Sequence, residues 1–125
     1  MGKILIADDA GFMRGSLKHI AEMAGHEVVG MAKDGKEALE LYRKLKPDLM
    51  TLDILMPPRD GLWALKAIMT EYPGAKVIMV TALGMEDKQE EAGKLGASGY
   101  VRKPFKLSEI VGEIERVLGK DEDEG

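Results

Sequence analysis

The stretch Lys3-Ile4-Leu5-Ile6-Ala7-Asp8-Asp9 joins a short apolar run to two consecutive carboxylates. The stretch Asp48-Leu49-Met50-Thr51-Leu52-Asp53 has the same form, an apolar run that ends at a carboxylate. Short apolar runs of this kind are typical of buried strands. A carboxylate at the end of a buried strand is costly to desolvate unless a cation or hydrogen bonds compensate for the burial. The two stretches therefore predict two buried strands that each end in acidic residues.

The rest of the chain continues this alternation of apolar runs and helical patterns. Strands are predicted at Ile4–Ala7, Glu27–Met31, Leu49–Asp53, Lys76–Val80 and Ser98–Arg102. Helices, in which apolar residues recur every three or four positions, are predicted at Phe12–Met23, Lys36–Leu45, Leu62–Tyr72, Glu86–Lys94 and Ser108–Leu118. Regular alternation predicts an α/β fold, a doubly wound five-stranded parallel sheet with helices on both faces. The first, third and fourth runs are almost wholly apolar, as expected of central strands.

Turn-forming residues separate these segments. Asp34-Gly35 and Pro73-Gly74 predict turns, and Gly25 and Gly96 each follow a helical pattern. Ser108 is predicted to be the N-cap of the last helix.

The composition is that of one globular domain. The 125 residues are 45% hydrophobic and 32% charged, and the absence of cysteine excludes disulfides and thiolate metal sites. A net charge of −4 argues against direct nucleic-acid binding, which needs a basic face. No membrane-spanning or signal segment is present, so we expect a cytoplasmic protein that does not bind membranes. Residues 120–125 are expected to form an acidic disordered tail or the start of a linker.

Functional side chains are predicted to gather at one edge of the sheet. Asp8-Asp9, Asp53, Thr81 and Lys103 each fall at or just beyond the carboxyl end of a predicted strand. In open α/β sheets, ligands bind at this edge. Three converging carboxylates repel one another, and a divalent metal is the natural compensation. For Asp8 and Asp9 alone, capping of the following helix is an equally good explanation.

These residues resemble the motifs of receiver domains of two-component response regulators. The resemblance runs from Lys3 to about Leu118 and gives a receiver domain at 1–119. The matching pieces are Ile6-Ala7-Asp8-Asp9, Asp53-Ile54-Leu55-Met56-Pro57-Pro58-Arg59-Asp60-Gly61, Thr81-Ala82 and Tyr100-Val101-Arg102-Lys103-Pro104-Phe105. The chain looks most like the single-domain chemotaxis regulators. The resemblance implies a flavodoxin-like sheet with strand order 2-1-3-4-5.

The resemblance also implies a role for each residue at the predicted site. Asp53 would accept a phosphoryl group from the phosphohistidine of a histidine kinase. Asp9 and Asp53 would bind Mg²⁺ directly, with Asp8 acting through water and Leu55 through its backbone oxygen. Lys103 would pair with a phosphoryl oxygen, and its bond to the following proline would be cis.

The same resemblance implies an output switch. The Thr81 hydroxyl would turn toward the phosphoryl group, and the Tyr100 ring would move into the space that it leaves. The face formed by the segments 86–94, 98–102 and 108–118 would change and control a downstream effector, a flagellar or archaellar motor component or an adaptor. The protein is expected to be a monomer. Leu55 and Leu83 are apolar where the hydrolytic water would pass, so slow self-dephosphorylation is expected.

Other interpretations remain open at this stage. One is a Mg²⁺-dependent phosphohydrolase with an aspartate nucleophile, although such enzymes carry a second acid where this chain has Leu55. A second is a flavodoxin-like cofactor binder, which would need a hydroxyl- and glycine-rich phosphate-binding loop where this chain has Asp8-Asp9. The others are a receiver that has lost phosphorylation and the N-terminal receiver of a larger regulator. Trp63 is expected to be partly exposed near Asp53, and His19 and His26 to be structural.

Overall fold

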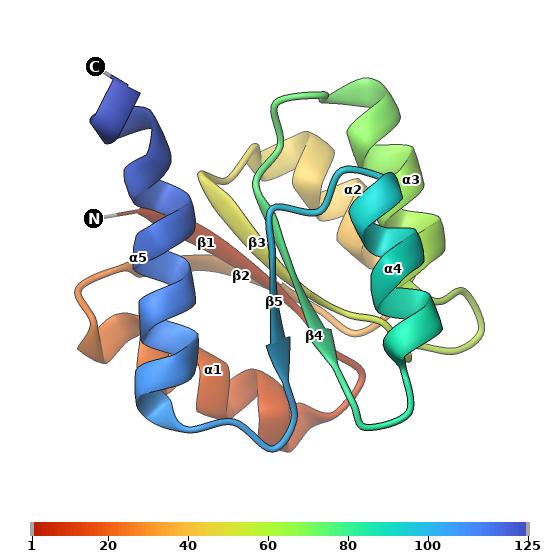
Figure 1. Ribbon diagram of the computed structural model, residues 1–125, viewed down its shortest axis with the longest axis horizontal. Helices are drawn as coiled ribbons and strands as arrows, with labels where there is room; N and C mark the ends of the chain where they lie inside the picture. The colour runs from red at the N-terminus through yellow and green to blue at the C-terminus, as the bar shows by residue number, and fades with distance from the viewer. Residues whose placement is uncertain (1, 125) are drawn as a thin grey trace.

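The computed structural model describes residues 2–124, and the side chains of residues 2–119. Strands and helices alternate along the chain as predicted (Figure 1). The strands are β1 (Lys3–Ala7), β2 (Glu27–Ala32), β3 (Leu49–Asp53), β4 (Val77–Thr81) and β5 (Gly99–Arg102). The helices are α1 (Gly11–Met23), α2 (Gly35–Leu45), α3 (Gly61–Glu71), α4 (Glu86–Lys94) and α5 (Leu107–Glu124). The acidic tail predicted for residues 120–125 lies outside the residues with described side chains and stays a prediction.

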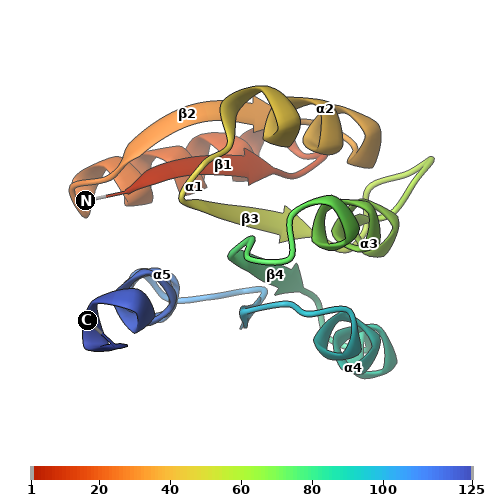
Figure 2. The same ribbon diagram turned by 90° about the horizontal axis from the view of Figure 1, so that it is seen from above.

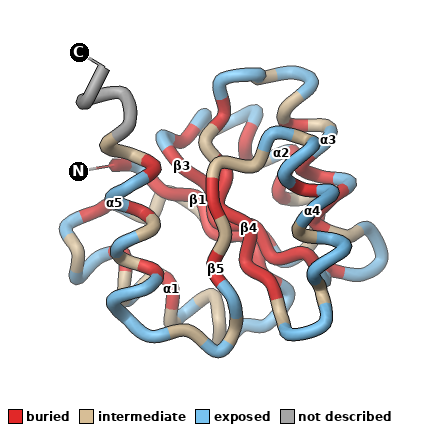
Figure 3. Tube along the Cα trace, viewed as in Figure 1, coloured by how far each residue is buried: buried red, intermediate tan, exposed pale blue. Residues whose placement is uncertain are grey.

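The five strands form one parallel sheet in the order β2-β1-β3-β4-β5, which confirms the predicted fold class. Two apolar clusters show which helices cover each face. One cluster joins the sheet to α1 and α5, and the other joins it to α2, α3 and α4 (Figure 2). The central strands β3 and β4 are buried along their whole length, and β1 is buried except at Lys3 (Figure 3). Burial from both sides explains why their sequences are nearly continuous apolar runs.

Side-chain caps fix the starts of three helices. Asp34 accepts a hydrogen bond from the Glu37 backbone N–H at the start of α2, and Asp60 does the same for Trp63 in α3. The prediction for α5 was wrong, because the helix begins at Leu107 and Ser108 lies inside its first turn. Instead, the Glu109 carboxylate accepts from the Lys106 backbone N–H at 2.8 Å. This is the carboxylate half of a capping box, so the cap lies two residues before the serine.

The free edge of β5 is covered by side chains of α5. The Glu113 carboxylate accepts from the Tyr100 backbone N–H at 2.9 Å, and the Arg116 guanidinium donates to the Ser98 carbonyl at 3.0 Å. Glu113 and Arg116 also pair with each other. A Cβ on Gly99 would overlap a Glu113 carboxylate oxygen, so a larger residue there would have to displace the ends of the Glu113 and Arg116 side chains. The pair satisfies backbone groups that an edge strand otherwise leaves open to another chain.

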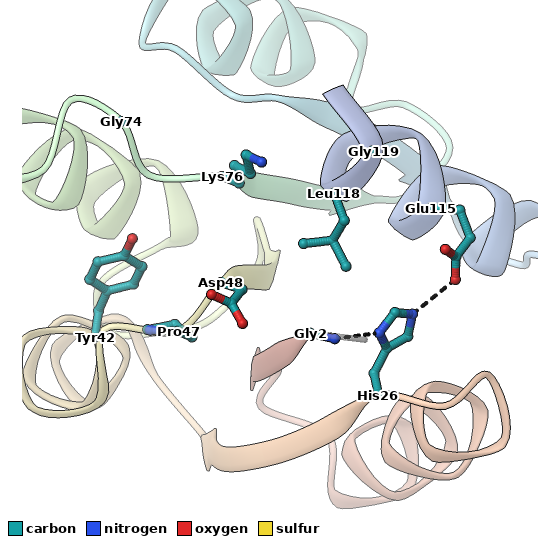
Figure 4. A pocket seen from close by; sticks show the side chains of 10 residues that line it. All are labelled: Gly2, His26, Tyr42, Pro47, Asp48, Gly74, Lys76, Glu115, Leu118 and Gly119. Carbon is teal, nitrogen blue, oxygen red and sulfur yellow. Dashed lines mark hydrogen bonds and ion pairs between the residues drawn. The ribbon is translucent and has the colours of Figure 1, made fainter. Parts of the chain in front are cut away.

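A hollow of about 490 Å³ lies at the amino end of the sheet, away from Asp8, Asp9 and Asp53 (Figure 4). His26 is buried beside it; its Nδ1 accepts from the Gly2 N–H, and its Nε2 lies 2.9 Å from a Glu115 carboxylate oxygen. These contacts join the residue before β1, the turn before β2, and α5, and they support the structural role expected of His26. Among residues 2–124, no helix has the length and apolarity needed to cross a membrane.

Candidate functional site

Three carboxylates meet at the carboxyl end of the sheet. Asp8 follows β1, Asp53 ends β3, and strand pairing of Ala7 with Leu52 places them side by side on neighbouring strands. Oxygens of Asp8, Asp9 and Asp53 all lie within 4.8 Å of one another. Asp8 is fully buried and Asp53 is 6% exposed, whereas Asp9 is open to solvent. A compact group of carboxylate oxygens with one open side suits a hard divalent cation such as Mg²⁺.

Lys103 supplies a positive charge to this cluster. Its Nζ lies 3.0 Å from Asp8 Oδ2 and 3.3 Å from Asp53 Oδ2, so one ammonium group bridges both buried carboxylates. The Lys103 N–H also donates to the Thr81 carbonyl at 2.7 Å, which aligns the residue after β5 with the end of β4. The Lys103-Pro104 peptide bond is cis, as the resemblance implied. The structure thus brings together the predicted aspartates and the predicted lysine.

Burial and charge repulsion act against ionisation of Asp53. Desolvation and then the charge of Asp8 raise the pKa of Asp53 from 3.8 to about 6, although Lys103 and a hydrogen bond from the Leu55 N–H partly oppose this. Burial alone would lower the pKa of Lys103, but its hydrogen bond to Asp8 and the charges of both aspartates outweigh burial and raise it. Lys103 therefore stays charged. A further cation beside Asp53 would favour the ionised form of its carboxyl group.

Replacing Asp53 with asparagine is expected to stabilise the metal-free protein at neutral pH. The folded-state pKa of about 6 exceeds the ordinary 3.8, so ionisation is less favourable in the folded chain than in the unfolded one. The advantage of the variant should grow as pH rises from about 4 to about 6 and then level off, at about 1–2 kcal/mol after allowance for solvent screening. Chemical unfolding with a chelator present measures this, and a variant less stable than the parent at neutral pH contradicts it.

The backbone after β1 is held by contacts of its own. The Ala10 N–H donates to Asp8 Oδ1 at 2.9 Å, and the Arg14 guanidinium donates to the Asp8 carbonyl at 2.7 Å. The N-cap of α1 is Ala10, and no side chain among the described residues caps that helix. The alternative that Asp8 or Asp9 caps the helix is therefore wrong. Asp8 instead shapes the turn, and Arg14 fixes the carbonyl between the two aspartates.

The loop from β3 to α3 is held by buried side chains and by a backbone hydrogen bond. Ile54 and Met56 are buried, while Leu55 between them is 51% exposed beside Asp53. The Gly61 N–H donates to the Ile54 carbonyl at 2.7 Å. A Cβ on Gly61 would lie 2.1 Å from the Asp53 carbonyl oxygen, far inside van der Waals contact. The loop therefore closes against the residue that ends β3 only because position 61 has no side chain.

The two predicted switch residues lie on neighbouring strands. Thr81 is 2% exposed, and its Oγ1 has no hydrogen-bond partner within the described part of the chain. A buried hydroxyl without a partner is costly, and Thr81 shares this property with Thr51 on β3. Tyr100 is half-buried with its hydroxyl against α4, where a Cβ on Gly93 would lie 2.7 Å away. A hollow of about 290 Å³ lies beside Tyr100, lined also by Ala82, Glu86, Gln89 and Arg102.

Known proteins are similar to this chain in sequence and in fold. The family model for the response regulator receiver domain matches residues 4–115. The chemotaxis protein CheY of Thermotoga maritima is 48% identical over 118 residues, 94% of this chain and 98% of that protein. The protein CcdB of Bacillus subtilis is 44% identical over 119 residues, 95% of this chain and 99% of that protein.

This chain is a response regulator receiver domain. The crystal structure of the CheX-CheY-BeF3-Mg+2 complex from Borrelia burgdorferi has a chain that superposes with a TM-score of 0.89 at 33% identity, covering 93% of this chain and 88% of that one. The resemblance inferred from the four sequence motifs is therefore confirmed over nearly the whole receiver domain.

Several residues that shape this receiver site were missed by reasoning from sequence. Arg14, Gly93 and Glu113 act through contacts between elements far apart in the chain, and a lone residue of these types in a helix carries no pattern.

A further feature is a set of exposed apolar side chains that follow four strand ends: Phe12, Leu55, Leu83 and Leu107. Exposed apolar groups around a polar site are typical of surfaces that bind proteins.

Proposed function

We propose that this receiver domain accepts a phosphoryl group on Asp53 from the phosphohistidine of a histidine kinase. An Asp53 carboxylate oxygen attacks phosphorus, the phosphorus–nitrogen bond breaks, and the imidazole leaves with the electron pair. The observation that carries the proposal is the Lys103 ammonium bridging Asp53 and Asp8 inside a three-carboxylate cluster. Phosphoryl transfer needs positioning and charge stabilisation more than covalent chemistry, and this cluster supplies both.

The residues present fit a Mg²⁺ ion as the cofactor of this reaction. Lys103 bridges the two buried carboxylates and the exposed Asp9 adds a third negative charge, so the cluster remains short of positive charge. Asp9 and Asp53 would hold the ion directly, Asp8 through water, and the Leu55 backbone oxygen would complete the protein ligands. When bound, Mg²⁺ supplies charge neutralisation between the carboxylates and the phosphoryl oxygens. Lys103 pairs with a phosphoryl oxygen after its ion pair with Asp53 breaks.

The proposal assigns signal output to Thr81 and Tyr100. The unpartnered Thr81 hydroxyl gains an acceptor when a phosphoryl oxygen arrives on Asp53. Movement of Thr81 opens space for the Tyr100 ring, which now rests against α4, and thereby alters the face made by α4, β5 and α5. An effector that distinguishes the two forms of this face would read the phosphorylation state.

The relatives support a role in chemotaxis. Relatives that this chain matches over almost their full length include the chemotaxis protein CheY of Thermotoga maritima. The Borrelia burgdorferi structure is a complex of a CheY with CheX, BeF3 and Mg+2, which supports protein partners for this fold. We therefore propose a cytoplasmic, monomeric regulator of motility whose effector is a motor component or an adaptor, with no direct contact to nucleic acid. It catalyses only its own phosphoryl transfer and slow dephosphorylation.

The experiment that tests this function is intact-mass measurement after incubation with acetyl phosphate and Mg²⁺. One added phosphoryl group is expected, and it should be absent from the Asp53→Asn variant and from samples with a metal chelator. Beryllofluoride, a stable mimic of the acyl phosphate, should bind the parent and not the variant. No adduct and no beryllofluoride binding by a folded protein would overturn the proposal.

Exposed apolar side chains beside Asp53 should make the phosphorylated form long-lived. Leu55 is 51% exposed and Leu83 is 79% exposed, and neither can orient an attacking water by hydrogen bonding. Replacing both with polar residues, Leu55→Asn with Leu83→Glu, should speed dephosphorylation about tenfold or more. The decay of the phosphorylated mass measures the rate. Equal lifetimes for parent and variant, or a parent lifetime of only seconds, would contradict the prediction.

A further inference from the structure

A groove lies between α2 and α3, on the opposite side of α3 from α4. It has a volume of about 540 Å³ and is lined by Lys36, Leu39, Glu40, Arg43, Arg59 and Trp63. The two helices are tied together by an ion pair between Arg43 and Glu71. Figure 2 shows α2 and α3 following one another around this side of the sheet, with α4 beyond α3. The groove is therefore separate from the face made by α4, β5 and α5.

Trp63 gives the groove an exposed aromatic wall. This side chain, the only tryptophan in the sequence, is 36% exposed at the start of α3. The Arg59 guanidinium stacks on it at 4.6 Å from the ring centroid. The stack holds both side chains in place before any partner arrives, which lowers the entropy lost on binding. Tryptophan and arginine are the residues most enriched at the energetic centres of protein interfaces.

The charge of the groove selects the partner. Arg43 is balanced by Glu71, and Glu40 also lines the groove, so Lys36 and Arg59 leave the lining with a small excess of positive charge. These two cations flank an apolar centre in a chain whose net charge is −4. Two cations are too few for a nucleic-acid backbone, which is bound through many phosphate contacts. They do match a protein segment that carries a few carboxylates around an apolar side chain.

We propose that the α2–α3 groove is a docking surface for an acidic protein segment. Carboxylates of the segment pair with Lys36 and Arg59, and an apolar side chain packs on Trp63 and Leu39. This surface is additional to the α4–β5–α5 face assigned to signal output above.

The groove shares its wall with the loop that leaves the acidic cluster. Arg59 belongs to the β3–α3 loop, six residues after Asp53 in the sequence. A Cβ on Gly35, at the start of α2, would lie 2.9 Å from the Arg59 carbonyl oxygen and 3.5 Å from Trp63 Cε3. The loop is thus packed directly on α2. A partner seated in the groove would contact both the helix and the loop that positions Asp53.

The test uses a synthetic amphipathic peptide of about 15 residues, made of leucine, alanine and glutamate with glutamates four positions apart. Its lysine-substituted counterpart is the matched control peptide. Binding is followed by Trp63 fluorescence and by anisotropy of labelled peptide, without phosphodonor or metal. The parent should bind the acidic peptide, and Arg59→Glu or Lys36→Glu should weaken binding about tenfold. Lys88→Glu, the same charge change on α4, should leave binding unchanged.

Four results would overturn the proposal. The first two are the absence of acidic-peptide binding and equal binding of the lysine peptide. The third is an equal loss in the Lys88→Glu variant, since charge alone would then explain the effect. The fourth is occupation of the groove by another class of partner, shown by an oligonucleotide or a second copy of the chain that binds with the same dependence on Arg59. Because no phosphodonor is present, failure here leaves the proposed phosphoryl acceptance at Asp53 untouched.

Discussion

Replacing Lys103 with methionine is expected to lower the free energy of unfolding of the metal-free protein by about 3 kcal/mol near neutral pH. Lys103 Nζ lies within 3.3 Å of oxygens of both Asp8 and Asp53. Methionine keeps much of the side-chain volume but removes the charge that bridges two buried carboxylates. Breaking a buried pair by removing one partner leaves the other charge uncompensated, which costs more than the pair itself contributes.

The loss should depend on pH in the direction set by Asp53. The charge and the hydrogen bond of Lys103 both lower the pKa of Asp53, so that pKa should rise above about 6 in the variant. A carboxyl group whose pKa is raised in the folded state destabilises the fold once pH exceeds the unfolded-state value. The difference between parent and variant should therefore be small near pH 4 and should grow through about pH 7.

Three controls separate this electrostatic effect from a simple packing defect. Adding Asp53→Asn to the Lys103→Met variant should restore most of the lost stability, because it removes one of the two repelling charges. Mg²⁺ should also restore stability to the single variant, since it supplies positive charge at the same carboxylates. Lys88→Met, on the exposed side of α4, should have little effect. A loss that is independent of pH and not rescued by Asp53→Asn would contradict the prediction.

The order of elements could be predicted from sequence because both faces of the central strands are covered. Burial on two sides makes β1, β3 and β4 nearly continuous apolar runs. In the helices between them, apolar residues recur every three or four positions. The prediction was wrong where two neighbouring residues could each cap the same helix. Ser108 looks like a cap, but Lys106 and Glu109 already form the cap contact two residues earlier. Strand and helix ends otherwise differ from the predicted bounds by at most one residue, apart from the end of α5, which runs on to Glu124.

The site was predictable to the extent that strand order alone brings residues together. In a parallel sheet all carboxyl ends meet at one edge, so Asp8, Asp53 and Lys103 converge whatever their detailed contacts. What sequence could not predict depends on distances of a few ångströms between separate elements. Arg14 on the Asp8 carbonyl and Gly93 under the Tyr100 hydroxyl are examples. No spacing rule connects those pairs, and only the packed fold places them together.

Replacing Gly61 with alanine is expected to destabilise the protein by about 3 kcal/mol and to disturb the site. The new Cβ would lie 2.1 Å from the Asp53 carbonyl oxygen and 3.0 Å from Ile54 Cα. Both neighbours are backbone atoms of the residues at the end of β3, so no flexible side chain can move away. Relief requires the β3–α3 loop to shift, and this breaks the hydrogen bond from the Gly61 N–H to the Ile54 carbonyl.

Gly112→Ala is the matched control for this change. Gly112 lies on the exposed side of α5, where an added Cβ meets no atom within 4 Å. Alanine is a better helix former than glycine, so this variant should be more stable than the parent by about 0.5–1 kcal/mol. Chemical unfolding of both variants measures the two effects. The opposite signs matter, because alanine favours a helix at either position, and only the close approach to the Asp53 backbone makes the change harmful at 61. Equal effects at the two positions would show that the loop can yield, and that Gly61 does not hold Asp53 in place.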